Sequence, residues 1–150
     1  LSEDGNQIIF HNYVNLAVAV GLEEGLIVPV VKHAEKMSLS ELVVAIKDLT
    51  ARTVSKKLLP DEQMGSTFTI SNLGMYGVSH FSAIINQPNA AILSVAATVK
   101  KPVVINNEIV IRPMMNMSLT SDHRLIDGLV AAKFMTDLKA LIENPFSLLI

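Results

Sequence analysis

Residues 114–128 read MMNMSLTSDHRLIDG, and they join an extended run to a helix through a short polar segment. Residues 114–119 are predicted to continue an extended strand, and the apolar spacing in residues 128–142 predicts a helix. A strand followed by a covering helix is typical of α/β folds. Strand-to-helix junctions often carry reactive side chains, so His123, inside this junction, is the first candidate for chemistry.

The rest of the chain predicts more strands and a second long helix. Strands are expected over residues 8–20, 26–31, 66–71 and 90–99, with a hairpin of residues 102–105 and 108–111. Asn106-Asn107 supplies the hairpin turn. Pro29 cannot donate a ladder hydrogen bond, which places its strand at a sheet edge or gives it a bulge. Hairpin signals and parallel-type runs coexist, so the expected fold class is α/β, a two-layer sandwich with a mixed sheet.

The second helix begins after Ser38. Ser38 and Glu41 have the spacing of a capping box, in which each side chain binds the backbone N–H of the other residue. Apolar residues then recur at helical spacing as far as Leu58, and Pro60 stops the run. The pattern predicts an amphipathic helix that covers the sheet.

Composition sets the size of the core and excludes several classes of partner. The chain has 150 residues, enough for one domain, and 50% of them are apolar while 17% are charged. This apolar excess indicates either a large core or surface buried against other subunits. With a net charge of −2 and no basic stripe, we expect no nucleic-acid partner. No apolar run approaches the ~20 residues of a membrane span, so no membrane partner is expected.

Four histidines are the candidate bases and metal ligands. His11, His33 and His80 are interpreted as surface or loop residues, whereas His123 is interpreted as a general base, because a neutral imidazole accepts protons near pH 7. Asp127 either orients His123 or caps the last helix. A zinc site made of His123 and Asp127 would need a third ligand, but no further histidine lies nearby and the chain has no cysteine, so no metal site is expected.

Ser71 ends the strand predicted over residues 66–71. The Gly-x-Ser-x-Gly frame of a nucleophile elbow is absent, so Ser71 suits a hydrogen-bond donor to a developing oxyanion better than a nucleophile. These residues favour a base that deprotonates the substrate's own thiol or hydroxyl group.

At this point a family resemblance becomes visible. His123-x-x-x-Asp127-Gly128 resembles the active-site motif of the chloramphenicol acetyltransferase-like fold, and Asp122-His123-Arg124-x-x-Asp127-Gly128 resembles the form found in dihydrolipoamide acyltransferases. Stretches 25–30, 65–74 and 84–93 are similar to other signatures of that family and occur in the same order.

The resemblance implies a mechanism and a set of site residues. His123 takes the proton of a thiol on dihydrolipoamide or coenzyme A, Ser71 donates to the oxyanion, and Asp127 supports the loop. Ser71, Asn72 and Ala96 match positions on the coenzyme A side of the site. In the family, the histidine and the serine come from neighbouring subunits of a homotrimer.

The resemblance also implies a place in a larger protein. Residues 1–150 match an acyltransferase catalytic domain truncated at its N-terminus, with no lipoyl or peripheral subunit-binding domain, so the lipoyl group is expected on another domain of the parent chain. Trimers are expected to form a cubic or icosahedral core through apolar C-termini such as residues 148–150, and to bind dehydrogenase components. Residues 72–77 look most like those of acetyl-transferring members, which implies acetyl-CoA as a substrate.

Two alternatives stay open at this stage. One is a catalytically silent structural core. The presence of both His123 and Asp127 counts against it, because a silent core does not need them. The other is a free-standing acetyltransferase acting on a small hydroxyl compound, as in the chloramphenicol branch, where a histidine precedes the catalytic one and this chain has Asp122. The expected location is the bacterial cytoplasm or, in a eukaryote, the mitochondrial matrix.

Overall fold

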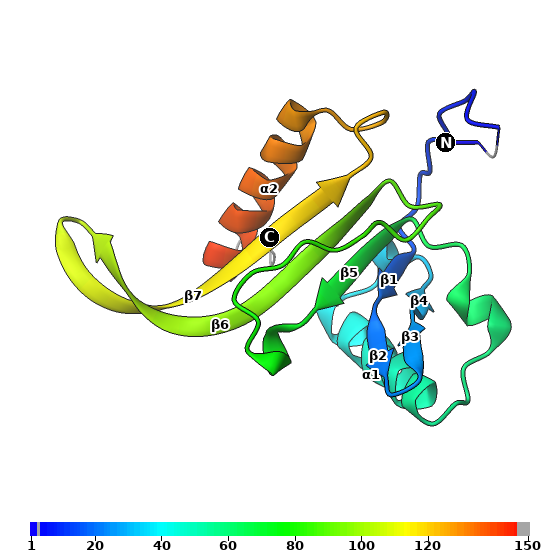
Figure 1. Ribbon diagram of the computed structural model, residues 1–150, viewed down its shortest axis with the longest axis horizontal. Coiled ribbons are helices and arrows are strands. Elements are labelled where there is room, and N and C mark those ends of the chain that lie inside the picture. The colour runs from blue at the N-terminus through cyan, green and yellow to red at the C-terminus, as the bar shows by residue number, and fades with distance from the viewer. Residues whose placement is uncertain (3, 147–150) are drawn as a thin grey trace.

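A five-stranded mixed sheet, in the order β4-β1-β5-β6-β7, forms one layer of the computed structural model, which describes residues 1–2 and 4–146 (Figure 1). Its strands are β1 (Leu16–Val18), β4 (Val30–Val31), β5 (Phe68–Asn72), β6 (Ala91–Ile105) and β7 (Glu108–Ser121). Strands β1, β5 and β6 run parallel, while β4 and β7 are antiparallel to their neighbours. The predicted α/β class with a mixed sheet is confirmed.

Two helices, α1 (Leu39–Val54) and α2 (Gly128–Glu143), cover the same face of this sheet. Leu16 and Phe68 are partners on adjacent parallel strands, so their side chains share a face. Leu16 packs against a cluster that includes Leu49 of α1, and the ring centroid of Phe68 lies 5.9 Å from that of Phe134 in α2. The molecule is therefore the expected two-layer sandwich.

The opposite face of the sheet carries hydroxyl groups and is covered by an irregular segment, residues 78–90 (Figure 1). Ser71, Ser94 and Ser118 lie level with one another on β5, β6 and β7. The Ser118 hydroxyl donates to the Phe81 carbonyl at 2.6 Å, and the Ala83 N–H donates to the Ser94 hydroxyl at 3.0 Å. These bonds hold the segment on the sheet beside Ser71.

Helix α1 begins as predicted but ends earlier. The capping box is present, since the Ser38 hydroxyl accepts from the Glu41 N–H and Glu41 Oε2 accepts from the Ser38 N–H at 2.7 Å. The predicted extension to Leu58 is wrong, because the helix ends at Val54 and Lys56 adopts a positive φ of 58°. A lysine has no local preference for this conformation, so periodicity alone could not show the break.

The first predicted strand is also shorter than expected. Within residues 8–20 only Leu16–Val18 and the start of β2 (Val20–Leu22) are extended strands. Both faces of β1 meet other residues, because Ala17 is fully buried while Leu16, on the other face, packs against the cluster that includes Leu49.

Pro29 divides the second predicted strand in two. Strand β3 (Gly25–Ile27) pairs with β2 in a separate two-stranded sheet, and β4 follows Pro29 at the edge of the main sheet. The interpretation of Pro29 as an edge or bulge residue is thus confirmed. Short 3₁₀ helices, η1 (Ala34–Lys36), η2 (Pro60–Gln63) and η3 (Gly74–Tyr76), complete the structure.

The predicted hairpin is present and is longer than expected. Strands β6 and β7 pair from Ala91 with Ser121 to Ile105 with Glu108, and Asn106 and Asn107 both have positive φ in the turn. Residues 100–113 form a curved arm that projects beyond the other strands (Figure 1). The apolar tail expected to contact other subunits, residues 148–150, lies outside the described residues. Within the described residues, no helix is long and apolar enough to cross a membrane.

Candidate active site

His123 lies in a tight turn between β7 and α2. The N–H groups of Leu125 and Ile126 both donate to the Asp122 carbonyl at 2.9 Å, which closes the turn around His123. The Asp122 N–H donates to the Ala90 carbonyl at 2.8 Å and so ties the turn to the start of β6. His123 is exposed, and its imidazole makes no hydrogen bond to any residue that the structure describes. The ring is therefore available to a substrate.

Asp127 begins α2. Its Oδ1 accepts from the Val130 N–H at 2.9 Å, which is the geometry of an N-cap. Of the two roles considered for Asp127, the structure shows the capping role. Through that cap Asp127 fixes where the His123 turn ends and the helix starts.

Asp122 and Arg124 form an ion pair across the backbone of His123. The Arg124 Nη2 lies 2.6 Å from Asp122 Oδ2, and the Arg124 Nε lies 3.0 Å from Asp122 Oδ1. These hydrogen bonds lower the pKa of Asp122 to about 2. The sequence pattern assigned no role to this pair, because contact between residues two apart depends on a turn geometry that spacing does not reveal.

Ser71 lies on β5, half-buried, on the hydroxyl-rich face of the sheet. Its partners Ser94 and Ser118 were missed by sequence reasoning, although small polar residues inside apolar strands were a signal. Ser94 and Ser118 bind the covering segment 78–90, whereas the Ser71 hydroxyl makes no hydrogen bond within the described part of the chain. The Ser71 hydroxyl is thus free to donate a hydrogen bond, while the bonds of Ser94 and Ser118 hold the covering segment beside it.

Asn72 and Ala96 are brought together around Gly74. Asn72 Oδ1 accepts from the Gly74 N–H at 2.8 Å, and a Cβ at Gly74 would lie 2.9 Å from the Ala96 carbonyl oxygen. Only glycine fits such a close approach of two backbones. Asn72 is exposed and can contact a ligand, whereas Ala96 is buried and shapes the backbone beside it.

Ser71 and His123 do not meet within one chain. Two strand spacings, about 10 Å, separate Ser71 from Ser118 across the sheet. Three extended residues then carry β7 roughly another 10 Å, from Ser118 to Ser121, before the His123 turn begins. Both side chains therefore cannot act on one carbonyl group unless they come from different chains.

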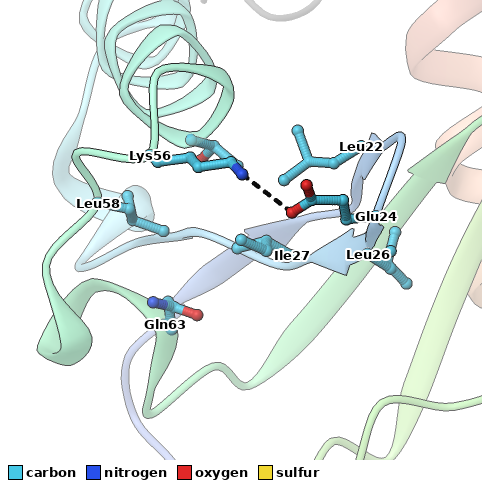
Figure 2. Close-up of a pocket in the computed structure, with 9 residues that line it drawn as sticks. Leu22, Glu24, Leu26, Ile27, Lys56, Leu58 and Gln63 are labelled. Carbon is cyan, nitrogen blue, oxygen red and sulfur yellow. Dashed lines mark hydrogen bonds and ion pairs between the residues drawn. The ribbon is translucent and has the colours of Figure 1, made fainter.

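The structure contains pockets that hold none of the predicted site residues. One, with a volume of about 350 Å³, lies between the β2–β3 hairpin and the end of α1, where Lys56 Nζ lies 2.9 Å from Glu24 Oε2 (Figure 2). A second, of about 270 Å³, is lined mostly by apolar residues of the sheet and α2 and includes Ile126, at the end of the His123 turn. Among residues 1–2 and 4–146, no group of three His, Cys, Asp or Glu residues is placed to hold a metal ion.

Comparison with known proteins gives the same family over the whole chain. The model of the 2-oxoacid dehydrogenases acyltransferase (catalytic domain) family matches residues 1–150. The chain is 45% identical over 149 residues to the dihydrolipoyllysine-residue acetyltransferase component of the pyruvate dehydrogenase complex of Rickettsia prowazekii. It is 42% identical over 149 residues to the succinyltransferase component of the 2-oxoglutarate dehydrogenase complex of Azotobacter vinelandii. The matched region is 99% of this chain in each case, but only 36% and 37% of those relatives.

Solved structures agree. One concerns the role of a serine, a histidine and an asparagine in the catalytic mechanism of Azotobacter vinelandii dihydrolipoamide acetyltransferase. It is 37% identical, with a TM-score of 0.94, covering 100% of this chain and 62% of that one. The cubic core of a pyruvate dehydrogenase multienzyme complex is 36% identical, with a TM-score of 0.92, covering 98% of this chain and 60% of that one.

Proposed function

This chain belongs to the family of 2-oxoacid dehydrogenase acyltransferase catalytic domains, and from that membership we propose that it transfers an acetyl group between coenzyme A and a dihydrolipoyl arm. We also propose that it forms part of the structural core of a 2-oxo acid dehydrogenase complex. The lipoyl arm belongs to another domain of the parent chain.

The spacing of three residues carries the proposal. In the Azotobacter acetyltransferase, the serine and the histidine studied for catalysis are 52 positions apart, and the asparagine follows four positions after the histidine. Ser71, His123 and Asp127 are separated by the same two intervals. The one difference in type is Asp127, where that protein has asparagine. Both residues can accept a hydrogen bond from a helix N-terminus.

The proposed reaction is a direct exchange between two thiols. His123 takes the proton from the attacking thiol, and the thiolate adds to the carbonyl carbon of the thioester. Ser71 of a neighbouring chain donates a hydrogen bond to the resulting oxyanion. As the tetrahedral intermediate collapses, the carbon–sulfur bond to the other thiol breaks, and the protonated His123 returns its proton to that leaving thiolate. Coenzyme A and dihydrolipoamide exchange the acyl group with no change in oxidation state.

Coenzyme A is proposed to bind near Asn72. The Asn72 carboxamide oxygen is used by the Gly74 N–H, but its NH₂ group has no partner in the described residues and can donate to a polar group of the ligand. Ser71 lies next to it on β5. Ala96 contributes through the backbone position that its contact with Gly74 sets.

The separation of Ser71 from His123 supports a homotrimer whose sites lie between chains. The arm also supports assembly, because its apolar side chains are uncovered in the single chain. The likeness to a cubic core favours a cubic or icosahedral shell of such trimers, to which dehydrogenase components bind. Residues 72–77 favour acetyl over succinyl as the acyl group, although relatives of both kinds are similar to this chain.

The first test measures acyl transfer from acetyl-, isobutyryl- and succinyl-CoA to dihydrolipoamide. We expect the highest kcat/KM with acetyl-CoA and a fall of about 10² or more in His123→Asn, the scale of losing a general base. His33→Asn is the matched control, because His33 is exposed and follows β4, at the opposite edge of the sheet from β7.

Three results contradict the proposal. A folded, assembled protein without transferase activity is a silent core. Transfer to a small hydroxyl compound but not to dihydrolipoamide identifies a free-standing O-acetyltransferase instead. Equal losses in His123→Asn and His33→Asn remove His123 from the mechanism.

A further inference from the structure

We propose that Asp122 and Arg124 act together as positioning residues that hold the backbone of His123 in place for proton transfer. This inference rests on the function proposed above. It assigns a task to two charged side chains that the proposed chemistry does not use.

The side chains of Asp122 and Arg124 are hydrogen-bonded to each other from either side of His123. Arg124 binds Asp122 through its guanidinium, with Nη2 2.6 Å from Oδ2 and Nε 3.0 Å from Oδ1. The Arg124 backbone N–H also donates to Asp122 Oδ1 at 3.0 Å. One carboxylate therefore fixes both the side chain and the backbone of the residue after the base.

Asp122 also fixes the rest of the turn. Its carbonyl accepts from the N–H groups of Leu125 and Ile126, and its N–H donates to the carbonyl of Ala90, the residue just before β6. Every backbone and side-chain polar group of Asp122 is thus used within the turn or to anchor it. The His123 imidazole has no hydrogen bond of its own to a described residue, so its position depends on the backbone at either side.

Exposed ion pairs usually add little to stability, and Arg124 is largely exposed. A bidentate pair between residues two apart is different in kind, because it restricts a short backbone segment rather than joining distant elements. At this turn, the position of His123 matters more for the reaction rate than the stability that the ion pair adds to the fold. A displacement of about 1 Å in a reacting group can cost roughly 10² in rate.

The test is a double-mutant cycle of Asp122→Ala, Arg124→Ala and the double variant in the complete assembled protein. We expect each single variant to lower kcat for acetyl transfer roughly 10-fold, with KM for coenzyme A changed by less than about 2-fold. The double variant should be no slower than the singles, since either change breaks the same unit. Arg124→Lys, which retains the charge without the planar fork, should recover part of the loss.

Hydrogen–deuterium exchange of residues 124–126 provides a readout that does not depend on activity. The amides of Arg124, Leu125 and Ile126 all donate to Asp122 and should exchange faster in Asp122→Ala. Glu24→Ala is the control, because it breaks the exposed pair with Lys56 at the β2–β3 hairpin and should change neither kcat nor exchange in the turn.

The outcomes separate this inference from the proposed function. An active parent protein whose folded Asp122→Ala and Arg124→Ala variants keep full kcat overturns the positioning role. Additive losses overturn it too, because they assign the two residues independent effects. An inactive parent overturns the proposed function, and the positioning of a catalytic base falls with it.

Discussion

At position 127 the structure and the comparisons point to one requirement, which is a side-chain oxygen at the start of α2. Asp127 Oδ1 accepts from the Val130 N–H, and the corresponding residue of the Azotobacter acetyltransferase is an asparagine by its spacing from the histidine. A capping role explains both residues, whereas a charged partner for His123 explains only one.

We therefore expect Asp127→Asn to keep most of the transferase activity and Asp127→Ala to lose stability. Asn and Asp cap helices about equally well, while alanine at an N-cap costs about 1 kcal/mol. Thermal unfolding and acetyl transfer, measured on both variants, check this. A large fall in kcat for a well-folded Asp127→Asn would show that the negative charge itself acts on His123.

Residues whose roles follow from local chemistry could be predicted from the sequence. Ser38 and Glu41 form their capping box because both partners lie within one helical turn, and Asp127 caps α2 for the same reason. The Asp122–Arg124 pair is equally local, but it forms only in the turn conformation, which no spacing rule specifies. The neighbours of Ser71 depend on strand register, a property of the whole sheet.

At the scale of elements, Lys56 has a backbone conformation that the sequence pattern could not predict. Its φ of 58° ends the helical pattern after Val54, and a non-glycine residue in this region carries a conformational cost. Nothing in the apolar spacing distinguishes it from its neighbour Lys57. The predicted helix therefore extended beyond Lys56, where the positive φ breaks the helical conformation.

Lys56→Gly should stabilise the protein by about 1 kcal/mol, because glycine adopts a positive φ without a side-chain clash. The lost pair with Glu24 offsets this only slightly, since both side chains are largely exposed. Chemical denaturation of Lys56→Gly and of Lys57→Gly, where φ is not positive, gives the comparison. Equal effects of the two substitutions would disprove a specific strain at Lys56.

The pair between α1 and η2 predicts a pH dependence of stability. Arg52 Nη2 lies 2.6 Å from Glu62 Oε1, and the hydrogen bonds from Arg52 lower the pKa of Glu62 to about 2. Because this folded pKa is below the ordinary value, the stabilisation is present above about pH 4.5. It is lost as the pH falls toward 2, where Glu62 becomes protonated in the folded protein too.

The unfolding temperature of the parent should therefore fall more between pH 5 and pH 2.5 than that of Glu62→Gln, which lacks the titrating group. Glu24→Gln removes a carboxylate that is 80% exposed in its ion pair, and its curve should run parallel to the parent's. If the unfolding temperature of Glu62→Gln changes with pH in parallel with that of the parent as well, Glu62 does not stabilise the fold through its charge.

At the scale of the whole molecule, the arm of residues 100–113 is the feature least explained by one chain. Ile109 is 79% exposed and Ile111 is 72% exposed, and the arm extends beyond the strands that could cover them (Figure 1). The Asn106-Asn107 turn predicted the hairpin but not its length, because the extent of pairing depends on both strands continuing through Pro102 and Pro113.

Ile109→Ser and Ile111→Ser together should reduce the size of the assembled particle in analytical ultracentrifugation, because they make polar a surface that we propose is buried between chains. Lys101→Ser, an exposed polar residue on the same arm, should leave the particle unchanged. An unchanged particle in the isoleucine double variant would place the subunit contacts elsewhere on the molecule.

The distance between Ser71 and His123 has a consequence for how substrates and assembly influence each other. If a reacting thioester is held by groups from two chains, its binding energy also joins those chains, so ligand binding and association are thermodynamically linked. In the homotrimer that we propose, reciprocity requires acetyl-CoA to strengthen subunit association by the same factor as association strengthens acetyl-CoA binding. Dilute protein should therefore hold together better at saturating substrate than alone.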